Sequence, residues 1–272
     1  MSEPEHTLSP HVVALNDEFL PIIRRFAVGR YAISVGGSQG KGTWDSRSDV
    51  DYRLFYEGEI PGPVANPELW RTLREALDRW AGVGVIVDGV WMRKIAQIDA
   101  ALDRWLSGEG APDDMVWTIW GYYPLPDIYH QGVIEDPYGV IAGWKQRLSV
   151  YPPALKRAVL SRHLASLRYW WSDYHYRHKV ERGDVVFTTG LTAKLVHSMI
   201  QVLFALNETY YVGDGENLDF VARFRHVPPG FGERVREVLY PAATGDRLAV
   251  QYEALLALIA QVLALVDDPE RG

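Results

Sequence analysis

The chain has 272 residues and a net charge of −7, with an apolar fraction of 47%. Its length suggests two domains, because a single domain most often holds about 150 residues. The sequence has no cysteine, which excludes disulfides, thiolate zinc sites and cysteine nucleophiles. The acidic balance and the lack of a run rich in lysine or arginine disfavour a nucleic-acid partner, since such partners are bound through their phosphates. A small-molecule substrate is expected instead.

Neither a secretory signal nor a membrane span is expected. The first six residues are polar and acidic, whereas a signal starts with a basic patch followed by an apolar core. The longest apolar run, Ala254 to Val266, is interrupted by Gln261 and is shorter than the roughly 20 residues that a membrane helix needs. We therefore expect a soluble, cytoplasmic protein with no membrane partner. The sequence leaves the oligomeric state open.

The first segment that could take part in ligand binding is a strand that ends in a glycine turn. Tyr31, Ile33 and Val35 alternate with smaller residues, which predicts a strand with one buried face. Gly36 and Gly37 break that strand and let the backbone come close to a ligand. Ser38 adds a hydroxyl where a short helix would begin, and the N–H groups at a helix start favour an anion.

The residues after this turn limit the length of the helix. Gly40 and Gly42 each cost a helix interior about 1 kcal/mol relative to alanine. The helix is therefore expected to be short or replaced by a loop, with Lys41 reaching toward a phosphate.

Two aspartates follow at a spacing that suits a metal site. Asp49 and Asp51 are two residues apart in an extended segment, so both side chains leave one face. Val50 and Tyr52 point to the other face. Mg²⁺ takes oxygen ligands, usually one or two carboxylates together with substrate phosphates, and Mn²⁺ suits the same ligands. The pattern indicates a metal-dependent site for phosphoryl-type transfer.

Taken together, Gly36-Gly37-Ser38, a short spacer and the Asp49-Val50-Asp51 triplet resemble the signature of the polymerase-β-type nucleotidyltransferase superfamily. The resemblance implies a nucleoside triphosphate as co-substrate and a third carboxylate from a later strand. The candidate is Asp88, because it lies in an apolar run, 84–92, that looks like a buried strand. The alternative is an aspartate at a strand end that caps a turn.

Other patterns give the organisation of the first half. Leu69, Leu73, Leu77 and Trp80 lie at helical spacing and predict a crossover helix over 66–81. Residues 129–139 are expected to form a last strand and a turn, since Asp-Pro and Gly are turn residues.

Helical patterns dominate the second half. One helix is expected to open at Pro152-Pro153, a second to run over about 191–206 and a third over about 247–266. The predicted fold class is α+β. Residues 1–140 are expected to form a nucleotidyltransferase domain, a small mixed sheet with flanking helices, and residues 141–272 a helical bundle that binds the acceptor.

A second resemblance extends over nearly the whole chain. A sheet domain, the Asp-Pro-x-Gly turn at 136–139 and the Leu-Asn-x-x-Tyr motif at 206–210 look like antibiotic nucleotidyltransferases of the aminoglycoside and lincosamide type and their uncharacterised bacterial relatives. This implies transfer of a nucleoside monophosphate from ATP or another triphosphate to a hydroxyl of a small molecule such as an antibiotic, with release of pyrophosphate. In similar enzymes a carboxylate of the helical domain is the general base. Glu181 and Asp184 are the candidates here, and Lys194 could reach the triphosphate.

These residues also have structural interpretations. Glu181 and Asp184 lie in a charged turn, where a solvated loop is the favoured expectation, and Lys194 can be an ordinary surface lysine. His175 and His178 could share a helix face as metal ligands, but a polar pair is favoured because no third ligand is in view. The aromatic runs at 117–123 and 169–176 are expected to pack in the core, with an acceptor pocket as the alternative.

Two rival functions remain open. One is a nucleotide-binding regulatory or catalytically inactive module, which the intact Asp49 and Asp51 argue against, since an inactive fold has no need of two like charges pressed together. The other is a toxin-like nucleotidyltransferase that acts on protein or RNA, and the acidic balance disfavours RNA. Arg168 and His175 also fit, loosely, the spacing found in certain helical ribonuclease toxins.

Overall fold

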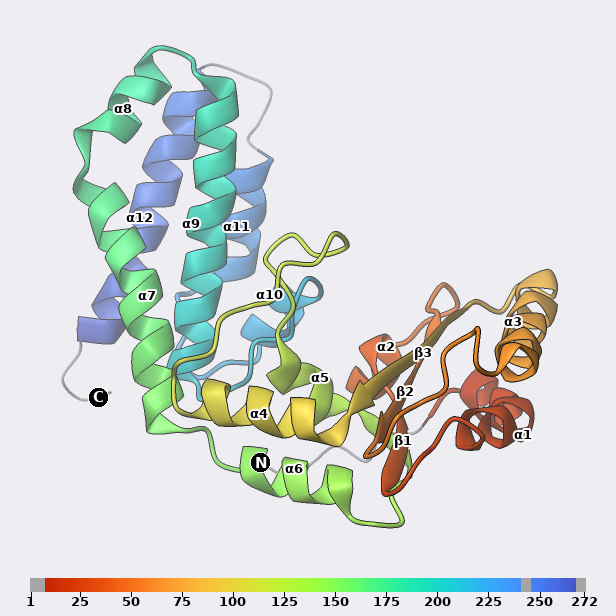
Figure 1. Ribbon diagram of the computed structural model, residues 1–272. Coiled ribbons are helices and arrows are strands. Elements are labelled where there is room, and N and C mark those ends of the chain that lie inside the picture. Colours follow the sequence, from red (N-terminus) through yellow and green to blue (C-terminus); the bar gives the residue numbers. More distant parts are fainter. Residues whose placement is uncertain (1–7, 241–245, 268–272) are drawn as a thin grey trace. The chain divides into compact units, whose positions relative to one another are not determined.

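The computed structural model describes residues 8–240 and 246–267, which fold into two units (Figure 1). The sheet unit takes the chain up to residue 104 together with 124–150, and the helical unit takes the rest. The described residues form twelve helices and one four-stranded sheet, so the predicted α+β class is confirmed. The first six residues, which bear on the expected lack of a secretory signal, lie outside the described residues.

The division between the units differs from the single boundary near residue 140 that the sequence predicts. Residues 140–150 belong to the sheet unit, and residues 105–123 belong to the helical unit although they precede part of the sheet unit in the chain. The chain therefore crosses between the units more than once, and pattern changes along the sequence do not reveal the earlier crossings.

The sheet unit is built on four strands in the order β3-β2-β1-β4. β1 pairs antiparallel with both β2 and β4, whereas β2 pairs parallel with β3, so the sheet is mixed as predicted. A parallel pair needs a crossover connection, and α3 supplies it. The strands are β1 Tyr31–Val35, β2 Val50–Tyr56, β3 Val87–Lys94 and β4 Gly132–Glu135.

Helices α1 (Pro10–Arg24) and α3 (Pro67–Gly82) pack side by side on one face of the sheet (Figure 1). Ser9 caps α1, and Asn66 caps α3 by accepting a hydrogen bond from the Leu69 N–H, so the predicted crossover helix is confirmed. The core on this face joins both helices to the strands: Val12, Leu15, Phe19, Ile23, Ile33, Val35, Tyr52, Leu54, Leu69 and Leu73.

Helix α6 (Val140–Leu148) covers the opposite face of the sheet. Its Trp144 packs edge-on against Phe55 of β2, with ring centroids 4.8 Å apart. The indole Nε1 of Trp144 donates a hydrogen bond to Asp99 of α4 (Ile95–Leu106) at 2.8 Å. Because helices lie on both faces, the two central strands, β1 and β2, are buried on both sides.

Three details of the strands correct the sequence predictions. Ala32 and Ser34 are buried as well as Ile33 and Val35, so β1 has two buried faces where one is predicted. The strand around Asp88 is predicted to be buried, yet β3 is an edge strand whose residues are mostly half exposed.

The third detail is the last strand. It is predicted over 129–139, but β4 is shorter because Tyr129 and His130 end helix α5 (Pro124–His130). The turn that follows β4 is where the sequence predicts it, with Gly139 N–H donating to the Asp136 carbonyl.

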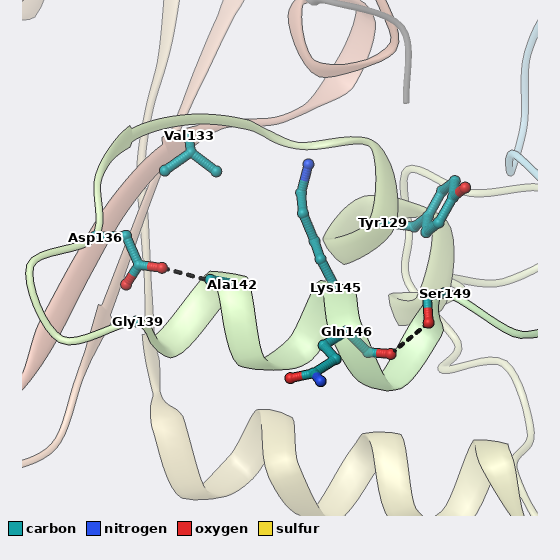
Figure 2. A pocket seen from close by; sticks show the side chains of 8 residues that line it. All are labelled: Tyr129, Val133, Asp136, Gly139, Ala142, Lys145, Gln146 and Ser149. Atoms are coloured by element: carbon teal, nitrogen blue, oxygen red, sulfur yellow. Dashed lines mark hydrogen bonds between the residues drawn. The ribbon is translucent and has the colours of Figure 1, made fainter. Parts of the chain in front are cut away.

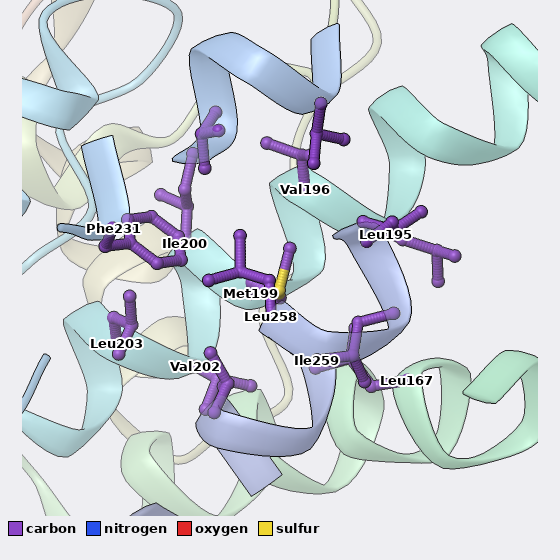
Figure 3. Packing of buried hydrophobic residues seen from close by; sticks show 14 of the residues in the cluster. Leu167, Leu195, Val196, Met199, Ile200, Val202, Leu203, Phe231, Leu258 and Ile259 are labelled. Carbon is purple, nitrogen blue, oxygen red and sulfur yellow. The ribbon is translucent and has the colours of Figure 1, made fainter. Parts of the chain in front are cut away.

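The helical unit has a core of its own, centred on α9 (Figure 3). Leu195, Met199 and Val202 of α9 meet Leu167 of α7 and Leu258 of α12, and all five are buried. The helices are α7 Pro153–Ser172, α8 Tyr174–Glu181, α9 Val185–Leu206, α10 Asn217–Val221, α11 Phe231–Leu239 and α12 Arg247–Asp267.

The ends of these helices test the sequence predictions. α7 begins at Pro153 and α12 covers the predicted range, so both helices are confirmed. α9 ends at Leu206 as predicted but begins at Val185, well before residue 191, because Asp184 caps it by accepting from the Phe187 N–H at 3.2 Å. The charged turn predicted around Glu181 and Asp184 is confirmed in part, because residues 182–184 separate α8 from α9 while Glu181 itself ends α8.

Helices α9 and α12 are long and apolar enough to cross a membrane by length and composition alone. The apolar run from Ala254 to Val266 is shorter than a membrane span, but α12 extends beyond that run at both ends. α9 is mostly buried inside the helical unit, and a core helix passes the same test.

Residues 105–123 join the helical unit through aromatic rings. Trp120 stacks on His197 of α9 with centroids 4.3 Å apart, and Tyr123 packs against Trp105 and Tyr211. Most of this run packs as predicted, but Trp117 is 62% exposed. In the second aromatic run, Tyr176 is buried, while Tyr169, Trp171 and Tyr174 are exposed.

The same region buries two histidines. His163 Nδ1 lies 3.3 Å from Ser198 Oγ, and the rings of His163 and His197 have centroids 5.8 Å apart. Burial, with the Arg162 charge nearby, lowers the pKa of His163 to about 4, and burial together with His163 lowers the pKa of His197 to about 3. Both rings are therefore neutral near pH 7.

We predict that the free energy of unfolding falls as the pH drops from about 6.5 to 4, because the unfolded histidines bind protons that the folded ones do not. By pH 4 each histidine lowers the free energy of unfolding by up to about 3 kcal/mol, since a shift of one pKa unit corresponds to about 1.4 kcal/mol. Urea unfolding at several pH values measures this. His197→Phe keeps a ring on Trp120 and should flatten the dependence, whereas His178→Phe, at an exposed position, should leave it unchanged. If the stability of His197→Phe depends on pH as that of the wild type does, the lowered pKa of His197 is contradicted.

Candidate carboxylate and glycine-turn site

Three aspartates from two neighbouring strands meet at one end of the sheet. Asp49 directly precedes β2 and Asp51 lies within it, while Val50 and Tyr52 are buried on the opposite face, as the alternation predicts. Asp88 lies in β3. One carboxylate oxygen from each aspartate lies within 4.8 Å of the others, a spacing that a single metal ion could bridge.

The position of Asp88 depends on an irregularity in the strand pairing. Val50 pairs with Val87, but Asp51 pairs with Gly89, so Asp88 is an extra residue on the β3 side. An extra residue of this kind re-aims side chains next to it. Sequence alternation alone could not show this, because the shift exists only in the pairing of two strands.

The glycine turn lies against Asp51. Helix α2 (Gly37–Lys41) is one short turn that begins after Gly36 and ends at Gly42, whose φ is +69°, so the predicted short helix is confirmed. Gly37 has a φ of +57°, and a Cβ there would overlap Asp51 Oδ2. A Cβ on Gly36 would lie 2.6 Å from Arg53 Nη2. Both glycines therefore make room for side chains of the protein itself.

The other residues predicted to bind nucleotide in this unit lie on α2. Ser38 and Lys41 are both half-buried, and the Ser38 carbonyl accepts from the Thr43 N–H at 3.0 Å. The structure thus brings Gly36, Gly37 and Ser38 together with the aspartates through the pairing of β1 with β2. Their role toward a nucleotide stays a prediction.

A buried arginine that sequence reasoning missed lies beside Asp51. Only 7% of the Arg53 side chain is exposed, and its Nη1 lies 3.7 Å from Asp51 Oδ1. Its Nη2 and Nε face the carboxylate of Asp127 in α5 at 3.2 and 3.4 Å. The sequence could have pointed to Arg53, because it lies two residues after Asp51 and therefore on the same face of β2. Nothing in the sequence around Asp127 indicates its role.

The electrostatics of this cluster are dominated by negative charge. Burial raises the pKa of Asp51 above its ordinary value, and the charges of Asp49, Asp127 and Asp88 raise it further, while Arg53 acts in the opposite direction. A divalent cation would relieve this repulsion. Carboxylate oxygens are ligands that Mg²⁺ and Mn²⁺ take in proteins, and the identity of the metal stays a prediction.

The residues predicted from the second half belong to the helical unit. Asp184 caps α9, and its Oδ2 lies 2.8 Å from Lys179 Nζ, so both its oxygens are engaged and its pKa is lowered, chiefly by the hydrogen bond from Lys179. Glu181 is exposed at the end of α8, and Lys194 is exposed on α9. The engagement of Asp184 favours its structural interpretation. The catalytic roles of the three residues stay predictions.

The histidine pair of α8 is exposed. His175 Nδ1 lies 3.1 Å from Asp173 Oδ1, and Arg168 pairs with Asp267. Across the described residues, the aspartate cluster is the group of three or more ligand side chains close enough to share a metal, and it contains no histidine.

A pocket lies elsewhere in the sheet unit, between β4, α5 and α6 (Figure 2). Asp136 on its rim is already engaged, since its two oxygens accept from the N–H groups of Val140 and Ala142. Lys145 extends across the space between Val133 and Tyr129. The pocket shares no residue with the aspartate cluster, so it adds nothing to a metal site.

Comparison with known families gives one match. A family model described as a domain of unknown function (DUF4037) matches residues 125–214, from α5 to the segment after α9. The match covers less than half of the chain, and it includes Asp127 but none of Asp49, Asp51 and Asp88. A comparison with curated proteins finds no match.

We predict that Gly37→Ala destabilises the sheet unit by about 1–3 kcal/mol, because alanine is strained at a positive φ and its Cβ displaces the Asp51 carboxylate. Thermal unfolding measures the loss. The matched control is Gly62→Ala, since no atom lies within 4 Å of a Cβ at that position. Equal midpoints for the two variants contradict the close approach.

A second prediction concerns Asp51→Asn without metal. At pH 7 the free energy of unfolding of the variant should exceed that of the wild type by about 0.5–2 kcal/mol, the range typical of relieving a charge conflict. The raised pKa means that the folded protein holds the proton more tightly than the unfolded chain, so the ionised form costs stability above the folded pKa. The gain should therefore shrink as the pH falls toward 4. Urea unfolding at pH 7 and pH 4 tests the sign, and a loss at pH 7 contradicts it.

Proposed function

We propose that the protein is a metal-dependent nucleotidyltransferase of the polymerase-β type. The observation that carries the proposal is the meeting of Asp49, Asp51 and Asp88 against the turn of Gly36 and Gly37. Chain segments distant in sequence converge there, and the pairing of β1, β2 and β3 brings them together.

In the proposed reaction, a hydroxyl of a small-molecule acceptor attacks the α-phosphorus of a nucleoside triphosphate. A bond forms between that oxygen and phosphorus, the bond to the β-phosphate bridging oxygen breaks, and pyrophosphate leaves. The three aspartates would hold Mg²⁺ or Mn²⁺, which neutralises triphosphate charge when bound. The chain's own contribution is positioning and electrostatics, which do most of the work in reactions of this class.

The remaining roles are assigned to polar residues of both units. Lys41 on α2 is proposed to contact the triphosphate, together with the Ser38 hydroxyl. Glu181 is the better candidate for the general base, because the oxygens of Asp184 already accept from Phe187 N–H and Lys179. Lys194 is proposed as a further contact to the triphosphate from the helical unit.

The first experiment follows the heat stability of the protein with ATP, GTP, CTP or UTP, each with and without Mg²⁺. A nucleotide present at about 100 times its dissociation constant adds about 2.7 kcal/mol to the free energy of unfolding. A shift that needs both nucleotide and metal supports the proposal and selects the donor for an acceptor screen. A shift without turnover of any acceptor, including protein and RNA, supports a nucleotide-binding module instead.

We predict that Asp49→Asn and Asp51→Asn each lower transfer at least a hundredfold, because a lost metal ligand removes several kcal/mol of charge stabilisation and about 1.4 kcal/mol is worth a factor of ten. Release of pyrophosphate measures transfer. The control is Asp45→Asn, an exposed aspartate of the preceding loop that bonds to Ser48 and the Arg47 N–H. Full turnover in both site variants would sink the proposal.

A further inference from the structure

Arg53 and Asp127 form a buried, two-pronged ion pair behind the aspartate cluster. Arg53 Nη2 lies 3.2 Å from Asp127 Oδ1, and Nε lies 3.4 Å from Oδ2, the fork-to-fork arrangement of arginine and carboxylate. Their side chains are only 7% and 12% exposed. Both groups have therefore given up most of their water, and removing either one would leave an uncompensated buried charge.

Other contacts fix the plane of the guanidinium. Trp91 is the direct partner of Arg53 across the β2–β3 pair, and the guanidinium carbon lies 5.0 Å from the centroid of its ring. Arg53 Nη1 also donates to the carbonyl of Tyr52 at 3.5 Å. The absent Cβ of Gly36 leaves the space that Nη2 and Asp127 Oδ1 occupy.

Asp51 lies between this fixed guanidinium and the glycine turn. Its Oδ1 faces Arg53 Nη1 at 3.7 Å, and its Oδ2 lies against Gly37. An aspartate beside two like charges would otherwise rotate away from them. The guanidinium of Arg53 on one side and the backbone of Gly37 on the other restrict that rotation.

We propose that Arg53, fixed by Asp127, is a positioning residue that holds the Asp51 carboxylate in the orientation a metal ligand needs. The inference rests on the proposed function, because that function makes Asp51 a metal ligand. It goes further by assigning a task to α5: this helix carries the aspartate that fixes the arginine. Lysine could not replace Arg53, because an ammonium group cannot make the two parallel hydrogen bonds.

Charge alone would have the opposite effect on metal binding. A guanidinium beside the cluster repels a cation, so removing Arg53 by itself also removes repulsion. The informative variant is the double substitution Arg53→Met with Asp127→Asn, which removes one positive and one negative charge and leaves the net charge unchanged. Its matched control is Arg30→Met with Glu57→Gln, which removes an exposed pair, 3.0 Å apart, at the opposite end of β1 and β2.

The experiment titrates each protein with Mn²⁺ and follows free Mn²⁺ by electron paramagnetic resonance, so it needs neither nucleotide nor acceptor. We expect the site double variant to bind Mn²⁺ about 10–100-fold more weakly than the wild type, the range seen when partners of metal ligands are removed. The control should bind as the wild type does. Equal binding by the site double variant overturns the inference and leaves the proposed function standing.

Two further outcomes are decisive. If the wild type binds no Mn²⁺, the metal site fails, and the inference fails with it. If the double variant does not fold, as judged by circular dichroism, Arg53→Lys decides instead, because it keeps the charge and loses only the two-pronged geometry. Weaker Mn²⁺ binding with an unchanged thermal midpoint supports positioning, whereas wild-type binding by Arg53→Lys overturns it.

Discussion

The electrostatics of the sheet unit depend on one constraint, which is that four aspartates lie near one another while one buried guanidinium, that of Arg53, faces two of them. The pKa of Asp51 is raised by burial and by the charges of three other aspartates, Asp49, Asp88 and Asp127. The positive charge of Arg53 lowers it. Like charges at this distance repel strongly when little water separates them. A fold that gathers them must hold them in place with rigid elements, and β2, β3 and α5 do so here.

The glycine turn is best understood through the same constraint. The sequence suggests that Gly36 and Gly37 are there so that a ligand can approach the backbone. The structure shows an additional reason, because a Cβ at either position would collide with Arg53 or Asp51. The turn is thus part of the wall that surrounds Asp51, whether or not it also contacts a phosphate.

The helical unit is stabilised separately, by a core centred on α9 and by aromatic rings from residues 105–123. Its buried histidines show how burial changes chemistry: neither ring has an acidic partner in the contacts described, and burial keeps both neutral. Asp184 shows the reverse case. The sequence offers Asp184 as a candidate general base but favours a solvated turn, and in the structure Asp184 caps α9 and accepts a hydrogen bond from Lys179.

The sequence by itself determined the elements whose signals are local. Helical spacing located α3, α7 and α12, and alternation placed Asp49 and Asp51 on one face of the extended segment that leads into β2, because side-chain direction follows from backbone geometry within a few residues. Only the tertiary structure decided which segments meet. The pair of Arg53 and Asp127 joins residues 74 positions apart, the extra residue at Asp88 exists only in the pairing of β2 with β3, and residues 105–123 join the helical unit by packing. Such contacts depend on how buried surfaces and charges match once the elements assemble, and no short stretch of sequence carries that information.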